Sequence, residues 1–252
     1  MSDLDGKVVL VTGASRGIGA AIARAVGGAG GAVVLHYSRG REDAEAIAGG
    51  LQKTGCHLVQ GDFECDDDVE RVWREAVDWK GRVDVIINNA GVYAMGGVDE
   101  DFDTWTGVWR RLLQVNLISA AHLCRQAVLH FRARGGGIIV NIASRAAFRG
   151  DTPDYMQYAA SKGGLVSLTR SLARGFAADN ILAYVIAPGF VRTDMAEDFT
   201  QIHGEEAVTK EIPLGDMASP EDVAEVVLFV ASGRARHATG TTIDINGASY
   251  VR

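Results

Sequence analysis

Two tyrosines and a lysine lie close together in residues 155–164, which read YMQYAASKGG. A free phenol has a pKa of about 10, so a tyrosine that exchanges protons at neutral pH needs a cation fixed beside it. On a helix, that cation must stand three or four positions away. Lys162 follows Tyr158 by four positions, whereas Tyr155 has Ala159 and the other tyrosine at those positions. The spacing favours Tyr158 as the working phenol, although it also occurs on ordinary solvated helices.

A glycine-rich stretch near the N-terminus forms a second group with recognisable chemistry. Residues 12–19 read TGASRGIG and stand between an apolar run and an Ala-rich stretch. Glycine lets the main chain turn sharply and approach a pyrophosphate, and the free N–H groups at a helix start attract its charge. No Gly-Lys-Ser/Thr follows, so a Walker loop is absent and a kinase or ATPase is disfavoured. We therefore expect a dinucleotide cofactor here.

The end of the next apolar run predicts which dinucleotide binds. NAD-binding proteins place an acid about twenty residues after the glycines, against the ribose 2′-hydroxyl. Here the run ends in HYSR (36–39), with Arg41 just beyond and no carboxylate. A guanidinium such as that of Arg39 can pair bidentately with a 2′-phosphate, and Arg16 adds positive charge. NADP is therefore favoured over NAD, with arginines that simply face water as the alternative.

Strand-sized apolar runs must position these groups. They alternate with Ala-rich, helix-favouring stretches, and their hydrophobicity is continuous, which is typical of a parallel sheet buried on both faces. This pattern predicts an α/β fold, a doubly wound, Rossmann-like, seven-stranded parallel sheet with helices on both faces in a single domain over 1–252. The runs cover residues 8–12, 33–37, 57–62, 83–91, 138–144, 181–189 and 241–247.

Local signals mark three further segments. Ser219 can cap a helix that has Pro220 at its first position, and this helix should end at Gly233. The acidic run ECDDDVE (64–70) predicts a solvated helix start rather than a metal site. The stretch from 194 to 218 has no clear strand, and we expect it to be a substrate lid.

Composition excludes several classes of function. The 252 residues carry a formal net charge of -7, which disfavours nucleic acid and anionic membranes as partners. The start, MSDLDGKVVLVTG, has no basic region and only a short apolar run, so a cytoplasmic protein is expected. Neither the three cysteines nor the six histidines have metal-ligand spacing, and no metal site is expected.

Six motifs in the same order make the chain resemble the short-chain dehydrogenase/reductase family from residue 7 to its C-terminus. Tyr158 with Lys162 is one of these motifs, and the glycine-rich stretch at 12–19 is another. The motifs are T-G-x-x-x-G-x-G at 12–19, N-A-G at 89–91, a helix Asn at Asn116, a strand-end Ser at Ser144, Tyr-x-x-x-Lys at Tyr158 and Lys162, and P-G-x-V-x-T at 188–193.

The resemblance implies roles for four catalytic residues. Ser144 would hold the substrate oxygen at the carboxyl edge of the sheet. Lys162 would bond the nicotinamide ribose and lower the pKa of Tyr158, which would give a proton to the forming alkoxide or accept one in the reverse direction. Asn116 would position a water that links Lys162 to solvent.

The resemblance also implies the cofactor and substrate contacts. Pro188, Val191 and Thr193 would hold the carboxamide and so decide which face of the nicotinamide ring delivers hydride. Substrate contacts are open to Tyr155, Tyr93, Met95 and Phe148. The remaining cofactor contacts are Gly13, Ser15, Arg16, Ile18 and Gly19 around the pyrophosphate and ribose, Ser38 and Arg39 near the 2′-phosphate, Asp62 and Phe63 against adenine, and Asn89, Ala90 and Gly91 on the adenine ribose side.

Within the family, the chain looks most like the 3-oxoacyl-carrier-protein reductases, especially in PGFVRTDM (188–195). Asp179 has the wrong sign for an acidic carrier, while three arginines nearby could still bind one, so an acyl carrier partner stays doubtful. Ala248 replaces the second glycine of a D-G-G motif that is frequent in these enzymes. The three arginines are Arg132, Arg134 and Arg174.

The sequence therefore predicts an NADP-dependent oxidoreductase that acts on a small carbonyl compound or secondary alcohol. An NAD-dependent sugar or alcohol dehydrogenase is one alternative, and a non-catalytic NADP-binding regulatory protein is another. Family likeness also implies a homotetramer, with Gly163 and Gly164 leaving room for a close helix contact.

Overall fold

The computed structural model describes residues 3–51, 53–194 and 208–252, and its centre is a seven-stranded parallel sheet. Each predicted apolar run overlaps one strand, with β2, β3 and β5 beginning one residue before their runs, so the predicted α/β fold class is confirmed. The strand order is β3-β2-β1-β4-β5-β6-β7. The strands are β1 (Val8–Val11), β2 (Ala32–Tyr37), β3 (Cys56–Gln60), β4 (Val85–Asn88), β5 (Gly137–Ile142), β6 (Ile181–Pro188) and β7 (Thr242–Ile245).

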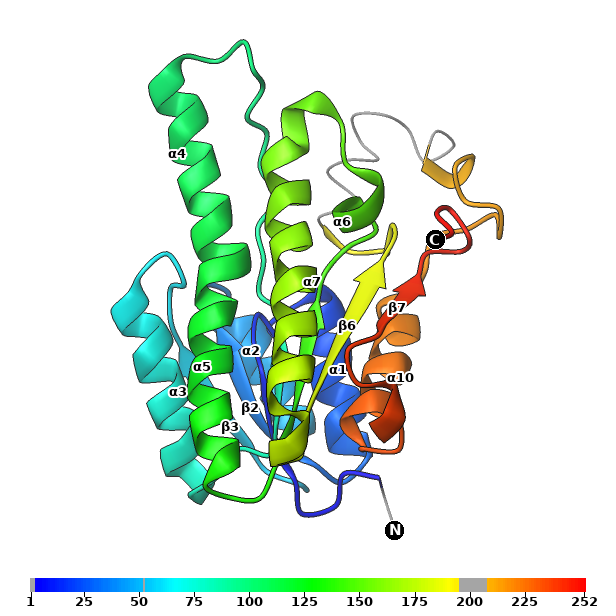
Figure 1. Ribbon diagram of the computed structural model, residues 1–252. Coiled ribbons are helices and arrows are strands. Elements are labelled where there is room, and N and C mark those ends of the chain that lie inside the picture. The colour runs from blue at the N-terminus through cyan, green and yellow to red at the C-terminus, as the bar shows by residue number, and fades with distance from the viewer. Residues whose placement is uncertain (1–2, 52, 195–207) are drawn as a thin grey trace.

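Helices cover both faces of the sheet (Figure 1). One face carries α1 (Gly17–Gly28), α2 (Arg41–Gly50) and α10 (Pro220–Ala231), and the other carries α3 (Asp66–Lys80), α5 (Ser119–Arg132) and α7 (Met156–Phe176). The described residues also form α4 (Phe102–Leu113), the π-helix η1 (Gln114–Ile118), α6 (Ala146–Arg149), and the 3₁₀ turns η2 (Pro153–Tyr155), η3 (Ala177–Asp179) and η4 (Arg236–Ala238).

The strands are apolar throughout because their side chains alternate between two cores. In β1, Val9 and Val11 pack with Ile22 of α1, while Val8 and Leu10 pack with the helices of the opposite face. All four residues of β1 are buried. A strand with helices on both sides has no solvent-facing position, so the alternating polar residues of an exposed sheet are missing.

The topology creates a crevice at one point of the sheet. From β1 the chain crosses to β2 and β3 on one side, and from β4 it continues to β5, β6 and β7 on the other. The helices that follow β1 and β4 therefore diverge at the carboxyl ends of these two strands. Ligands of open α/β sheets bind at such a switch point.

Helix boundaries follow the predicted signals closely. The Ser219 hydroxyl accepts from the Asp222 N–H and the Asp222 carboxylate accepts from the Ser219 N–H, which together cap α10. The helix ends at Ala231, and Gly233 adopts a left-handed φ of 82°. The acidic run opens α3 at Asp66, as predicted.

The glycine pair of α7 allows a close contact within the chain. A Cβ added to Gly164 would lie 2.7 Å from Cδ2 of Leu117 in the same chain. The space beside Gly164 is thus occupied by the η1 segment, and a contact of the pair with a second copy stays a prediction. Within the described chain, no helix is long and apolar enough for a membrane crossing. The predicted lid extends over 194–218, of which residues 195–207 lie outside the described residues.

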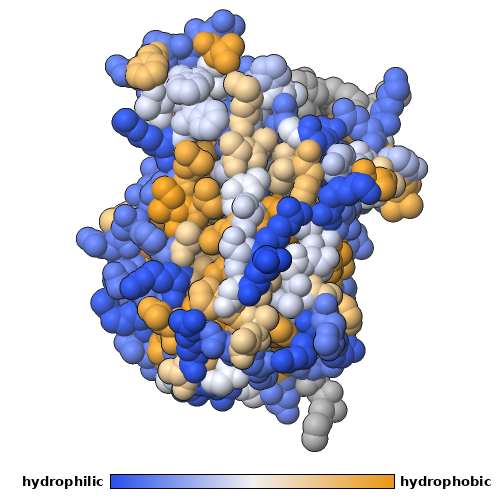
Figure 2. All heavy atoms as spheres, in the orientation of Figure 1, coloured by the Kyte–Doolittle hydropathy of each residue, from blue (hydrophilic) through white to orange (hydrophobic). Residues whose placement is uncertain are grey.

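Apolar side chains reach the surface over α5 and α7. Figure 2 shows them between polar side chains on the face that these helices form. Ile118 at the end of η1 and Leu129 of α5 are among the exposed large hydrophobic residues, as is Met156 of α7.

Candidate active site

Tyr158 and Lys162 lie on one face of α7, as their spacing predicts. The Lys162 ammonium nitrogen stands 5.8 Å from the centre of the Tyr158 ring and donates to the Ile142 carbonyl at 2.9 Å. Lys162 is 4% exposed, whereas the phenol is half-buried. The carbonyl at the end of β5 therefore fixes the ammonium below the tyrosine.

Ser144 joins this pair from the end of β5. Its hydroxyl oxygen accepts from the Ala146 N–H at 3.1 Å, which holds the side chain at the start of α6. The same hydroxyl lies near the Tyr158 phenol and acts to lower its pKa. Two residues that are fourteen positions apart in the sequence therefore meet at one point, where a substrate oxygen can reach both hydroxyls.

Burial shifts the pKa values of these groups in opposite directions. Desolvation raises the pKa of Tyr158 to about 12, with the Ser144 hydroxyl as a smaller opposing effect. Desolvation lowers the pKa of Lys162 to about 8. The expected lowering of the phenol pKa is thus not present in this structure, because burial of the ring is the largest effect on it and the ammonium donates to the Ile142 carbonyl instead.

Asn116 lies in the π-helix η1, between α4 and α5. Its amide donates to the Val92 carbonyl and to the Ser161 hydroxyl, and its carbonyl oxygen accepts from the Val92 N–H at 2.8 Å. π-Helical turns are rare and frequently occur at functional sites. The amide ties the chain after β4 to α7, next to Lys162.

Gly91 leaves free space beside the ammonium. A Cβ placed on Gly91 would lie 3.3 Å from Lys162 Nζ and 3.4 Å from Asn116 Oδ1. Any side chain here would crowd both polar groups. The glycine keeps open the position from which a ribose hydroxyl could bond to Lys162, so the residues present fit a nicotinamide nucleotide.

Aromatic rings pack beside Tyr158. Tyr93 stacks on Tyr155 with ring centres 4.1 Å apart, and its ring meets that of Tyr158 edge-on at 4.8 Å. Asp151 lies near Tyr93, and burial raises the pKa of its carboxyl. Tyr155 thus borders the site through Tyr93. Met95 is 56% exposed, and Phe148 stacks on Tyr250.

The glycine turn is held together by the N-A-G motif. The Asn89 side chain donates to the Thr12 and Gly13 carbonyls, and the Thr12 hydroxyl accepts from the N–H groups of Asn89 and Ala90. A Cβ on Gly19 would lie 2.2 Å from the Gly13 oxygen. The helix start can therefore pack directly on the turn only if residue 19 has no side chain.

Other predicted contacts surround the same turn. The Thr193 methyl group would lie 3.1 Å from a Cβ on Gly17, so the segment after Pro188 closes on the start of α1. Val191 is buried, and Arg16 pairs with Asp194 at 3.2 Å. Ser15 lies beside Gly40, and Ile18 packs partly against the core.

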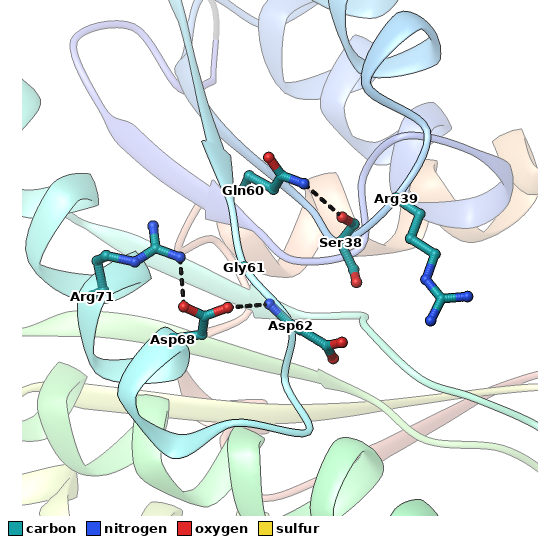
Figure 3. Close-up of a pocket in the computed structure, with 7 residues that line it drawn as sticks. All are labelled: Ser38, Arg39, Gln60, Gly61, Asp62, Asp68 and Arg71. Atoms are coloured by element: carbon teal, nitrogen blue, oxygen red, sulfur yellow. Dashed lines mark hydrogen bonds and ion pairs between the residues drawn. The ribbon is translucent and has the colours of Figure 1, made fainter.

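A hollow of about 330 Å³ lies at the carboxyl ends of β2 and β3. Arg71 is tied to Asp68 on one side of it, and Arg39 extends on the other (Figure 3). Among the described residues, Arg39 has no ion-pair partner. The hollow is lined by Ser38, Arg39, Gln60, Gly61, Asp62, Asp68 and Arg71.

The two residues predicted to contact adenine, Asp62 and Phe63, differ in whether their side chains reach this hollow. Asp62 lines the hollow, and its N–H donates to the Asp68 carboxylate at 2.7 Å. The Phe63 side chain is only 3% exposed and stacks on His36 inside the protein. Phe63 therefore presents its main chain, and not its ring, to a ligand.

Sequence reasoning missed residues that the structure places in the site. Thr12 opens the T-G-x-x-x-G-x-G motif, but its bonds to Asn89 and Ala90 depend on the contact between β1 and β4, which the sequence does not show. His36 was visible as a polar residue in an apolar strand, which is a usable signal. Asp151 has no motif around it, so only the tertiary structure brings it to Tyr93.

The comparison with known proteins agrees with this geometry. A family model described as Enoyl-(Acyl carrier protein) reductase matches residues 13–248. The chain belongs to the short-chain dehydrogenase/reductase family. This short-chain dehydrogenase/reductase is thus an NAD(P)-dependent oxidoreductase, as the six motifs predict.

Several similar members of the family act, by their names, on different substrates. The 3beta-hydroxysteroid dehydrogenase 1 of Eggerthella lenta is 36% identical, with 97% of this chain and 94% of the relative covered. A 3-oxoacyl-[acyl-carrier-protein] reductase of Aquifex aeolicus is 35% identical, with 98% of each covered. A solved Beutenbergia cavernae structure, described as an NAD(P)-dependent gluconate 5-dehydrogenase with NADP at low occupancy, has a TM-score of 0.90 and 32% identity, with 99% of both chains covered.

Proposed function

We propose that this short-chain dehydrogenase/reductase uses NADP to reduce a ketone or oxidise a secondary alcohol, with Tyr158 as proton donor and acceptor. The observation that carries the proposal is the convergence of the Ser144 and Tyr158 hydroxyls above the buried Lys162 ammonium. When bound, the nicotinamide would supply or accept the hydride.

The protein groups have separate tasks in this proposal. A phenol with a raised pKa stays protonated at neutral pH, so Tyr158 can give its proton to a developing alkoxide, which is more basic. Ser144 holds the substrate oxygen and keeps it in line with the phenol. Lys162 stabilises negative charge on Tyr158 when the proton leaves. Asn116 positions a water through which the proton is replaced from solvent.

The hollow at the ends of β2 and β3 supports NADP as the cofactor. A 2′-phosphate needs a cation that is not already neutralised, and Arg39 borders the hollow without an ion-pair partner among the described residues. Arg71 is already occupied, because Asp68 and Glu75 both bind it. The NADP in the Beutenbergia cavernae structure supports the same choice. We infer that Arg39 binds the 2′-phosphate.

Exchange of Arg39 for Asp tests the cofactor. We expect NADPH to bind at least tenfold more weakly to Arg39→Asp while NADH binding stays within threefold, because only NADPH carries the 2′-phosphate. Fluorescence titration with both nucleotides measures this. Arg41→Asp is the matched control, since it makes the same charge change at a residue that pairs with Glu45. An equal loss in both variants, or no loss in either, would remove Arg39 from the phosphate site.

A substrate panel tests the reaction. The protein is mixed with NADPH and with 3-oxoacyl thioesters, ketosteroids, sugars and diketones, and the loss of NADPH absorbance is followed. We expect turnover with at least one class. Tight NADPH binding with no turnover across the panel would instead favour the non-catalytic alternative.

The surface gives an acyl carrier protein little support as a partner. Arg132, one of the three candidate carrier contacts, pairs with Asp179 at 2.7 Å and stacks over Phe176. Its charge is therefore already matched within the chain. We therefore propose a free small molecule as the substrate. A comparison of turnover with a 3-oxoacyl-coenzyme A thioester and with the carrier-bound thioester tests this proposal.

A further inference from the structure

His36 is a polar residue inside an otherwise apolar strand. It lies one position before the end of β2 and is 2% exposed. Its ring is parallel to that of Phe63, with centres 4.1 Å apart and planes 5° from parallel. A buried polar ring is costly unless both of its nitrogens find partners.

The two partners of His36 determine where its proton lies. Nδ1 is 3.1 Å from the Gly13 N–H, which can only donate, so Nδ1 must hold the lone pair. Nε2 is 3.1 Å from the Gly61 carbonyl oxygen, which can only accept, so Nε2 must carry the hydrogen. Both bonds require a neutral ring in a single tautomer.

These two bonds join three segments that surround the cofactor site. Gly13 is in the glycine turn after β1, and Gly61 is in the turn after β3 that leads to Asp62. The His36 main chain adds a third connection, because its carbonyl accepts from the Ala14 N–H at 2.8 Å. The strand end that carries His36 continues into Ser38 and Arg39. One side chain thus connects the pyrophosphate turn to the adenosine hollow.

We propose that His36 is a positioning residue that, as the neutral Nε2–H tautomer, holds the glycine turn and the adenosine hollow in the spacing that the dinucleotide requires. The proposal rests on the cofactor site proposed above. His36 does not touch the cofactor and acts through Gly13 and Gly61.

The surroundings of the ring keep it neutral. Burial is the largest effect and lowers the pKa of His36 to about 4. Asp68 and Asp62 act in the opposite direction from α3 and from the turn after β3, while Arg71 adds to the lowering. The ring therefore stays neutral throughout the pH range in which an oxidoreductase of this kind is assayed.

Two substitutions separate the two bonds. In His36→Asn the amide oxygen can take the place of Nδ1 and accept from Gly13, whereas in His36→Gln the longer amide reaches Gly61 and leaves the Gly13 N–H without an acceptor. The Asn variant keeps the Gly13 bond and loses the Gly61 bond, and the Gln variant does the reverse. Because the proposal needs both bonds, we expect NADPH affinity to fall about tenfold or more in each. The substrate KM should stay unchanged in both, a split that general destabilisation would not produce.

The control is His57→Asn in the adjacent strand. His57 stacks on Trp79 and stands near the start of β3, away from the carboxyl edge, so NADPH affinity should be unaffected. Equal NADPH affinity in the unaltered protein and in either His36 variant would overturn the proposal. A failure of the unaltered protein to bind NADPH would contradict the proposed function itself, so the two failures are distinguishable.

Nitrogen NMR of the ¹⁵N-histidine-labelled protein tests the tautomer directly, even where the Gln variant does not fold. We expect one protonated and one unprotonated ring nitrogen for His36 at pH 7, with the hydrogen on Nε2. A charged ring, or a hydrogen on Nδ1, would overturn the proposal because the Gly13 N–H would then face another donor.

Discussion

Burial of the Tyr158–Lys162 pair determines how its two residues can act. Desolvation favours the neutral form of both, so it raises the pKa of the phenol and lowers that of the ammonium. The phenol therefore holds its proton across the neutral range, while the lysine approaches its titration point. The two residues lose their protons at different pH values, with a pKa of about 8 for Lys162 and about 12 for Tyr158, so each can be tested separately.

Tyr158→Phe tests the proton donor. We expect turnover to fall by about a thousandfold or more while NADPH affinity changes only a few fold, because the ring is kept and only the hydroxyl is lost. Steady-state rates and fluorescence titration measure the two quantities. Tyr155→Phe is the matched control, three positions away in the same stretch, and should keep turnover within a few fold. Full activity of Tyr158→Phe would exclude it as the donor.

The pH dependence of reduction tests the charge of Lys162. With a pKa of about 8, Lys162 is an ammonium below that pH and loses its charge above it. We expect kcat for reduction to fall as pH rises through about 8, by up to tenfold per unit, while Tyr158 remains protonated. Stopped-flow rates from pH 6 to pH 10 measure this. In Lys162→Arg the fall near pH 8 should disappear, since a guanidinium stays charged. A flat profile in the unaltered protein would contradict the assignment.

Among the elements, the turn between β1 and α1 depends most strongly on the absence of side chains. Gly13 adopts a φ of 61°, and a Cβ added to it would lie 2.9 Å from the Cα of Ala90. Gly19 packs on the carbonyl of Gly13 and on the Asn89 amide. The turn is therefore defined as much by packing against the N-A-G segment as by the approach of a phosphate.

Two glycines of the same helix should respond in opposite ways to alanine. Gly19→Ala places a Cβ 2.2 Å from the Gly13 oxygen, so we expect the free energy of unfolding to fall by about 3 kcal/mol and NADPH affinity to fall with it. Gly28→Ala meets nothing within 4 Å and should raise the free energy of unfolding by about 0.5–1 kcal/mol. Urea unfolding measures both. Equal midpoints for the two variants would contradict this account of the turn.

At the scale of the whole molecule, the sheet brings both halves of the site to one edge. The glycine turn follows β1, the hollow follows β2 and β3, and Ser144 follows β5, so residues from 12 to 193 meet at the carboxyl ends of parallel strands. The layer that α5 and α7 form lies on one face of the sheet, beside this edge (Figure 1). Apolar side chains on α5 and α7 are exposed there, and we propose that copies of the chain associate through this face (Figure 2).

Light scattering tests the assembly. Family likeness predicts a tetramer, so we expect a mass four times that of the chain. Leu129→Glu puts a charge on a residue that is 49% exposed in this face, and this variant should have a lower mass. Arg24→Glu, at an exposed position of α1 on the other face of the sheet, is the control for added negative charge. A monomeric mass for the unaltered protein would contradict the tetramer.

Local patterns predicted the strands and the reactive pair because both depend on short-range geometry. A strand buried on two faces needs consecutive apolar residues, and a helix places positions i and i+4 on one face. These rules made the seven strands and the Tyr158–Lys162 pair visible in the sequence. The cap of α10 at Ser219 is of the same kind, since its bonds extend over only three residues.

The sequence by itself determined the order of the elements, the glycine turn and the motifs of the family. Only the tertiary structure decided the direction of the Tyr158 pKa shift, the close contact of Gly164 with the Leu117 side chain, and the bonds of His36 to two turns. The physical reason is that burial and contact between distant segments depend on which residues the folded chain brings together, and spacing along the chain does not contain that information.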